Sequence, residues 1–152
     1  MTYPTTSNRT QVKRALVDRL IPKATEIEEC RALYGFPLNG EYGQRDICVL
    51  GAEGAQEPGS KTEGRARRRD KFRLHVWMGD QTPGYDTPEI AENAAMALLA
   101  LLENVIAEDR TLGGNVHSAF IEQVDGPLAT PGASEGWISF INAYVMCDAE
   151  LR

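Results

Sequence analysis

Apolar residues recur at helical spacing in two segments of the chain. The first segment, residues 9–20, predicts an amphipathic helix that ends near Pro22. Its apolar positions are Val12, Ala15, Leu16 and Leu20. The second segment, residues 86–109, starts with Asp86 or Thr87 as N-cap. Its apolar face, wide enough to predict the main cover of a sheet, consists of Ile90, Ala94, Ala97, Leu98, Leu101, Leu102, Val105 and Ile106.

Four other segments have the patterns of strands. Residues 45–51 form a short apolar run that Gly51 ends, and residues 115–123 nearly alternate in polarity. Residues 71–79 alternate strictly, with Phe72, Leu74, Val76 and Met78 on one face and Arg73, His75 and Trp77 on the other. Residues 137–151 are apolar at both parities, which is typical of a strand buried on both faces or covered on one face by a neighbouring subunit.

The remaining segments separate these elements. Residues 52–70 are rich in Gly, Pro, Ser and charge, which predicts a long solvated loop, mobile in the free monomer. Gly126 to Gly136 predicts a second loop. Residues 23–44 fit either a short helix or a poorly patterned strand, and the choice stays open. The element order therefore predicts an α+β fold, α-β-β-α-β-β, in which two helices pack on a mainly antiparallel sheet of about four strands, with a long flexible loop.

Length and composition place this fold in a single domain. A chain of 152 residues buries a sufficient core without disulfides or metal. Its odd number of cysteines, Cys30, Cys48 and Cys147, favours a reducing compartment such as the cytoplasm. The longest apolar run, residues 94–102, is about half of the roughly 20 residues that span a bilayer. We therefore expect no membrane insertion and no cleaved signal peptide.

No motif in the chain predicts catalysis. His75 and His117 lie within strands and have no acid or cysteine at ligand spacing. Gly113 and Gly114 follow a helix, whereas a phosphate-binding loop precedes one. The cysteines fit small buried side chains better than nucleophiles. We therefore predict that the protein is not an enzyme and has no catalytic residue, cofactor or metal.

Charge is concentrated in one place. Residues 61–73 hold seven basic residues against Glu63 and Asp70, in a chain of net charge −6. The preferred interpretation is a solvated loop, because no aromatic residues are interleaved for base stacking, and nucleic-acid binding by residues 65–73 is the alternative. A third interpretation pairs this basic segment with the second helix of another copy. That helical segment has no Lys or Arg before Arg110, and its acids are Asp86, Glu89, Glu92, Glu103, Glu108 and Asp109.

The helix-to-strand connection carries a short motif of the form D-x-T-L-G-G-x-V. Its residues here are Asp109, Thr111, Leu112, Gly113, Gly114 and Val116. With the element order and the strand ends "VLG" and "VWMG", this stretch resembles the tail terminator proteins of long-tailed double-stranded DNA bacteriophages, especially actinobacterial ones. These are also called minor tail or head-to-tail connector proteins. In that family, such a stretch commonly joins the second helix to the third strand.

The resemblance implies a structural virion protein at the head-proximal end of the tail, assembled in the host cytoplasm. Similar proteins form hexameric rings that stop tube polymerisation and present a surface to the head-completion proteins. The implied partners are further copies of the chain, the tail tube protein, a head-completion or stopper protein and, transiently, genomic DNA in the lumen. The candidate contacts with a subunit or partner are Arg65, Arg67, Arg68, Arg69, Trp137 and Tyr144.

The motif also has a physical interpretation that needs no family. A helix end requires a left-handed residue, which glycine supplies at little steric cost. We therefore predict that Gly113 or Gly114 has positive φ and that Leu112 folds under the helix end as an apolar plug. In this interpretation Thr111, Leu112, Gly113 and Gly114 form a structural hinge between helix and strand.

Overall fold

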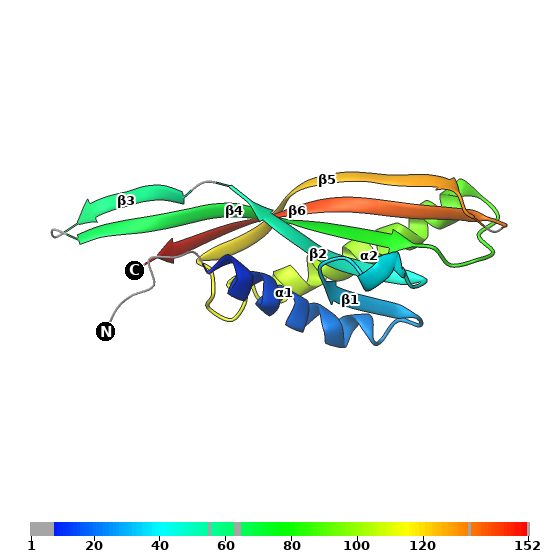
Figure 1. Cartoon of the computed structure of the whole chain (residues 1–152), viewed down its shortest axis with the longest axis horizontal. Helices are drawn as coiled ribbons and strands as arrows, with labels where there is room; N and C mark the ends of the chain where they lie inside the picture. The colour runs from blue at the N-terminus through cyan, green and yellow to red at the C-terminus, as the bar shows by residue number, and fades with distance from the viewer. Residues whose placement is uncertain (1–7, 55, 63–64, 134, 152) are drawn as a thin grey trace.

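The computed structural model describes residues 8–54, 56–62, 65–133 and 135–151, which form two layers (Figure 1). One layer is a sheet, and the other consists of helices α1 (Arg9–Ala24) and α2 (Pro88–Glu108). Both helices share one core with a single face of the sheet. The predicted α+β class, with two helices on a mainly antiparallel sheet, is confirmed.

The sheet contains more strands than predicted. Its strands are β1 (Cys30–Tyr34), β2 (Arg45–Glu53), β3 (Gln56–Thr62), β4 (Arg65–Asp80), β5 (Ser118–Pro131) and β6 (Trp137–Leu151). They follow the order β1-β2-β4-β6-β5, and β3 pairs with the first part of β4. Only β1 and β2 are parallel; the other pairs are antiparallel.

The two longest strands, β4 and β6, form the centre of the core. In β4 the side chains of Phe72, Leu74, Val76 and Met78 are at most 1 % exposed and face the helices, as their alternation predicts. Buried apolar residues of β6 lie opposite them: Ala143 is paired with Val76, and Ile141 is paired with Met78. Burial of a large apolar side chain stabilises a fold by about 1.5 to 3 kcal/mol, so this ladder is a major source of stability.

The face of helix α2 that packs on the sheet is rotated about the helix axis from the predicted apolar face. Thr87 is its N-cap, and its side chain accepts a hydrogen bond from the amide of Ile90 at 3.3 Å. The prediction that Ile90, Ala94 and Ala97 belong to the buried face is wrong: Ile90 is 47 % exposed, Ala94 is half-buried and Ala97 is exposed. Small residues at other positions contact the sheet in their place, because they let the helix approach it closely. The buried residues are Ala91, Ala95, Leu98, Leu99, Leu101, Leu102, Val105 and Ile106.

By length and hydropathy, α2 is the one helix in the described residues that is long and apolar enough to cross a membrane. Its large leucines lie against the sheet, and 44 % of the apolar window is buried inside the fold. Packing on the sheet accounts for the apolar composition of this helix.

Several predicted boundaries shift. Helix α1 continues past Pro22 to Ala24, because a proline so near the end removes few hydrogen bonds and the amide of Thr25 still closes the last turn on the carbonyl of Ile21 at 3.0 Å. Residues 23–44, for which helix and strand were both open, contain the strand β1 and a short 3-10 turn at Leu38–Gly40. The predicted loop from Gly126 is wrong in its first half, because β5 continues to Pro131 through two register shifts.

The prediction of a long loop over residues 52–70 is also wrong. Its described residues belong to the end of β2, to β3 and to the start of β4. We call β3 together with residues 65–69 of β4 the basic arm. Most of this arm extends beyond the rest of the sheet, because β6 ends opposite Arg68 and β2 ends opposite Arg73 (Figure 1).

Candidate functional site

The sheet face opposite the helices carries the main candidate site. In β4 the residues Arg73, His75 and Trp77 point to this face and are half-buried. The register places His75 beside Tyr144 and Trp77 beside Asn142 of β6. Neither α-helix covers these residues, since both lie on the other face. The side chains on this face therefore meet solvent or a partner.

A row of rings runs across this face. His75 stacks on Tyr144 with the ring centroids 4.9 Å apart, and Trp77 stacks on Phe140 at 6.5 Å. The connection between β1 and β2 adds Tyr42, whose ring lies 5.2 Å from that of Trp77. Such ring pairs contribute about 0.5 to 1.5 kcal/mol beyond area burial, so the row fixes its own geometry.

Polar groups hold the His75–Tyr144 pair of the ring row. The guanidinium of Arg73 lies over the ring of Tyr144, 4.7 Å from its centroid, and also pairs with Glu53. The ring nitrogen Nε2 of His75 hydrogen-bonds Oδ1 of Asn142 at 2.6 Å. These contacts orient the side chains of Arg73, His75 and Tyr144.

Trp77 depends on a glycine two residues further along β4. A Cβ added at Gly79 would lie 2.2 Å from Cη2 of Trp77, because the indole packs directly over the glycine backbone. Alternate residues of a strand share a face, so a side chain at position 79 would occupy the space of the indole. Gly79 therefore lets Trp77 lie flat on the sheet.

Large apolar side chains lie exposed around the ring row. Phe120 and Leu128 of β5 are 48 % and 56 % exposed, and they lie opposite Met146 and Phe140 on the same face. Phe36 and Leu38, in the connection between β1 and β2, are 59 % and 86 % exposed. Large exposed apolar patches are typical of interaction sites. We call it the aromatic sheet face, formed by Phe36, Tyr42, His75, Trp77, Phe120, Leu128, Phe140, Tyr144 and Met146.

The helix-to-strand motif forms a fixed turn at another place. Gly113 and Gly114 have φ of +72° and +83°, which confirms the predicted positive φ. Leu112 is fully buried, as expected for the apolar plug, and itself adopts φ of +48°. A non-glycine residue in the left-handed region is strained, so the surrounding contacts must hold it there.

Asp109 organises that turn. Its carboxylate accepts hydrogen bonds from the amide of Gly113 at 2.8 Å and from the hydroxyl of Thr111 at 2.9 Å, and it pairs with Arg19 of α1 at 2.8 Å. These interactions lower the pKa of Asp109, and the hydrogen bond from the Gly113 amide is the largest cause. Thr111, Leu112, Gly113 and Gly114 therefore connect α2 to β5 through a hydrogen-bonded turn.

The predicted contact residues do not form one cluster. Tyr144 belongs to the aromatic sheet face, whereas Trp137 has the parity of the core residue Ile141 and begins β6 opposite Pro131. The backbones of Arg65, Arg67, Arg68 and Arg69 lie in the basic arm. Sequence reasoning missed most of the aromatic sheet face, although the strict alternation around His75 and Trp77 was a signal of it.

Three buried carboxylates were also missed, and each pairs with an arginine. Asp46 pairs with Arg31 at 2.8 Å and Asp80 with Arg45 at 3.1 Å. Asp70 pairs with Arg9 at 2.7 Å. The three carboxylates are at most 1 % exposed, so they fix strand ends and loops and are not accessible to a substrate.

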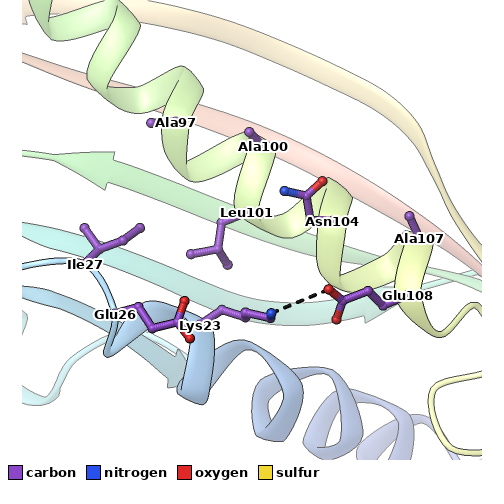
Figure 2. Close-up of a pocket in the computed structure, with 9 residues that line it drawn as sticks. All are labelled: Lys23, Glu26, Ile27, Ala97, Ala100, Leu101, Asn104, Ala107 and Glu108. Carbon is purple, nitrogen blue, oxygen red and sulfur yellow. Dashed lines mark ion pairs between the residues drawn. The ribbon is translucent and has the colours of Figure 1, made fainter.

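A shallow groove lies on the helical side, between the end of α1 and the middle of α2 (Figure 2). Its volume is about 510 Å³. Ala97, Ala100 and Leu101 form part of its lining, and Lys23 pairs with Glu108 at its rim at 3.5 Å. The small side chains of its lining suit the approach of a protein segment.

The cysteines give no sign of reactivity. All three are free and buried. Burial raises the pKa of Cys30 to about 11 and that of Cys48 and Cys147 to about 12. Within the described ranges, no group of three or more His, Cys, Asp or Glu side chains is placed to hold a metal ion.

Neither a scan against protein-family models nor a search of curated protein sequences finds a protein similar to this chain.

Proposed function

We propose that the protein is a structural subunit that assembles with further copies of itself through the aromatic sheet face. The single observation that carries the proposal is that one face of the sheet is without a helical cover yet displays large apolar side chains. Phe36 and Leu128 are each more than half exposed there, and Phe120 is 48 % exposed. Aromatic residues, Met and Arg are enriched in protein interfaces, and all three types occur on this face.

The assembly that we propose is the tail terminator ring of a long-tailed bacteriophage. Support comes from the sequence resemblance, from the α+β fold with two helices on one sheet face, and from the motif Asp109–Val116, which occupies the connection between the second helix and the following strand. The partners of such a ring are neighbouring copies, the tail tube protein and a head-completion protein. Genomic DNA would pass through its lumen.

A second candidate function is nucleic-acid binding, favoured by one specific observation. The fold brings Arg73 onto Tyr144, so a ring row lies next to the end of the basic run, although no aromatic residues interleave with the arginines in the sequence. Aromatic side chains on an open sheet are a known platform for stacked bases. The rings here stack largely on one another, and the chain carries a net charge of −6, so we place self-assembly first.

Electron microscopy tests the proposed function. Purified protein, alone and mixed with tail tubes, is expected to give closed rings that cap one tube end. Phage produced without this gene is expected to carry overgrown tails and free heads. A monomeric protein that binds single-stranded oligonucleotides tightly, with a strong dependence on salt, would instead support the second candidate.

A further inference from the structure

The outer side of α2 is an acidic surface. Over its 21 residues the helix has no lysine or arginine. Among the described residues, Glu108 has an ion-pair partner, Lys23, whereas Glu89, Glu92 and Glu103 form no ion pair. We call the solvent side of this helix the acidic α2 face. It is formed by the half-buried Glu92 and the exposed residues Glu89, Met96, Ala97, Ala100, Glu103, Ala107 and Glu108.

The shape of the acidic α2 face suits an extended segment. Its middle consists of Ala97 and Ala100, both exposed, and the groove of about 510 Å³ runs beside them (Figure 2). Small side chains let a partner backbone approach closely. At a rise of about 1.5 Å per residue, α2 offers a surface about 31 Å long.

The basic arm has the complementary charge. Residues 56–69 contain five basic and two acidic residues and no large apolar residue. This segment thus carries +3, and the rest of a chain of net charge −6 carries −9. At about 3.3 Å per residue, the seven residues of β3 span about 23 Å, which fits the length of α2.

The arm is a two-stranded ribbon over much of its length. Much of it extends past the ends of β2 and β6, and a two-stranded ribbon is marginally stable by itself. Without large apolar residues, it does not match the aromatic sheet face. A polar and acidic partner surface fits its composition best.

We propose that the basic arm of one copy docks on the acidic α2 face of the next copy. This inference rests on the proposed self-assembly and names its second contact. Arm and acidic α2 face are different surfaces of the same chain, so the contact is heterologous and closes into a ring when its rotation closes. The aromatic sheet face supplies an apolar contact between copies. The docked arm adds a charged contact, which sets the orientation of neighbouring copies.

The register of the arm places an acidic residue opposite Arg69 in each neighbouring strand. Arg69 lies opposite Glu57 in β3 and opposite Glu150 in β6. Arg65 and Arg67 lie nearer the tip, beyond the pairing with β6.

Paired charge reversals test the contact. The arm variant is Arg65→Glu with Arg67→Glu, and the α2 variant is Glu92→Lys with Glu103→Lys. Measured by sedimentation velocity at low salt, each variant is expected to associate at least about tenfold more weakly than the wild type, because like charges then face each other. The variant with all four changes is expected to recover association, since opposite charges again face each other.

Control variants and the possible outcomes distinguish the docking inference from the proposed function. Arg110→Glu and Glu28→Lys alter exposed charges elsewhere and are expected to leave association unchanged. Normal assembly of both reversal variants would overturn the docking inference alone. An arm variant that assembles normally but loses a salt-dependent affinity for an oligonucleotide would assign the arm to nucleic acid. A wild-type chain that stays monomeric would contradict the proposed function, and the inference with it.

Discussion

The two faces of β4 are made by adjacent residues of one strand and have opposite properties. Leu74 and Val76 are fully buried under the helices, whereas His75 and Trp77 between and beside them keep part of their surface in solvent. The helix-covered face obtains its stability from close packing of aliphatic side chains. The uncovered face uses rings that stack on one another and leaves Phe120 and Leu128 exposed. The difference teaches that one face maintains the fold, while the other is available for a partner.

The largest expected effect is a loss of folding stability that differs between the two faces of the sheet. Leu98→Ala removes a side chain that is 1 % exposed at the centre of the covered layer, so we expect a loss of about 2 to 5 kcal/mol in the free energy of unfolding. Leu128→Ala, the same change on the aromatic sheet face, is expected to cost less than about 1 kcal/mol in the monomer. Urea denaturation at low protein concentration measures both. Equal costs would contradict the assignment of separate roles.

A glycine on the uncovered face tests how its rings are held. Gly79→Ala brings a Cβ into the indole of Trp77, so we expect Trp77 to leave its position, at a cost of about 1 to 3 kcal/mol. In a Trp137→Phe background Trp77 is the only tryptophan, and its fluorescence maximum is expected to shift to longer wavelength. Gly51→Ala, where an added Cβ meets no atom within 4 Å, is the matched control in a neighbouring strand. An unchanged spectrum of Gly79→Ala would refute the packing of indole on glycine.

The turn that follows α2 depends on two glycines with left-handed backbone conformation. Gly114→Ala is expected to cost about 1 to 2 kcal/mol, because an L side chain is strained at φ of +83°. Gly113→Ala is expected to cost slightly more, since its Cβ would also lie 2.6 Å from a guanidinium nitrogen of Arg19. Thermal unfolding of the two variants gives the comparison. Wild-type stability in either variant would show that the turn does not require glycine there.

A smaller effect concerns acid stability. The pKa of Asp109 is lowered in the folded protein, so its contribution to stability is present above the unfolded pKa of 3.8 and is lost as pH falls through the folded pKa. Asp109→Asn removes this titration. We therefore expect the variant to lose less of its melting temperature than the wild type as pH falls below about 4. Parallel pH curves for the two proteins would mean that Asp109 makes no such contribution.

Local patterns in the sequence were sufficient for much of the covered layer. The strict alternation in residues 71–79 predicted which side chains of β4 face the core, and the Thr87–Pro88 start predicted the beginning of α2. The rotation of α2 was not predictable, because alanines occur on most of its sides and hydrophobic spacing alone fits two faces. Contact with the sheet decides between them.

The uncovered face and the arm depend on contacts between distant segments. Tyr42 joins Trp77 from a segment with no clear pattern, and Phe140 joins it through the register of β6 with β4. The sequence of β3 contains Pro, Gly and charged residues and has the composition of a loop, yet pairing with the backbone of β4 makes it a strand. Neither result follows from local propensity, which tertiary context overrides in strands.

The most direct test of the aromatic sheet face as a self-association surface is sedimentation velocity of Phe120→Ser with Leu128→Ser beside the wild type. The matched control is Ile21→Ser, because Ile21 is an apolar residue of α1, outside the aromatic sheet face, and is 39 % exposed. We expect the wild type and the control to sediment as a concentration-dependent oligomer, and the double variant to sediment as a folded monomer. A double variant that associates as strongly as the wild type would contradict the account.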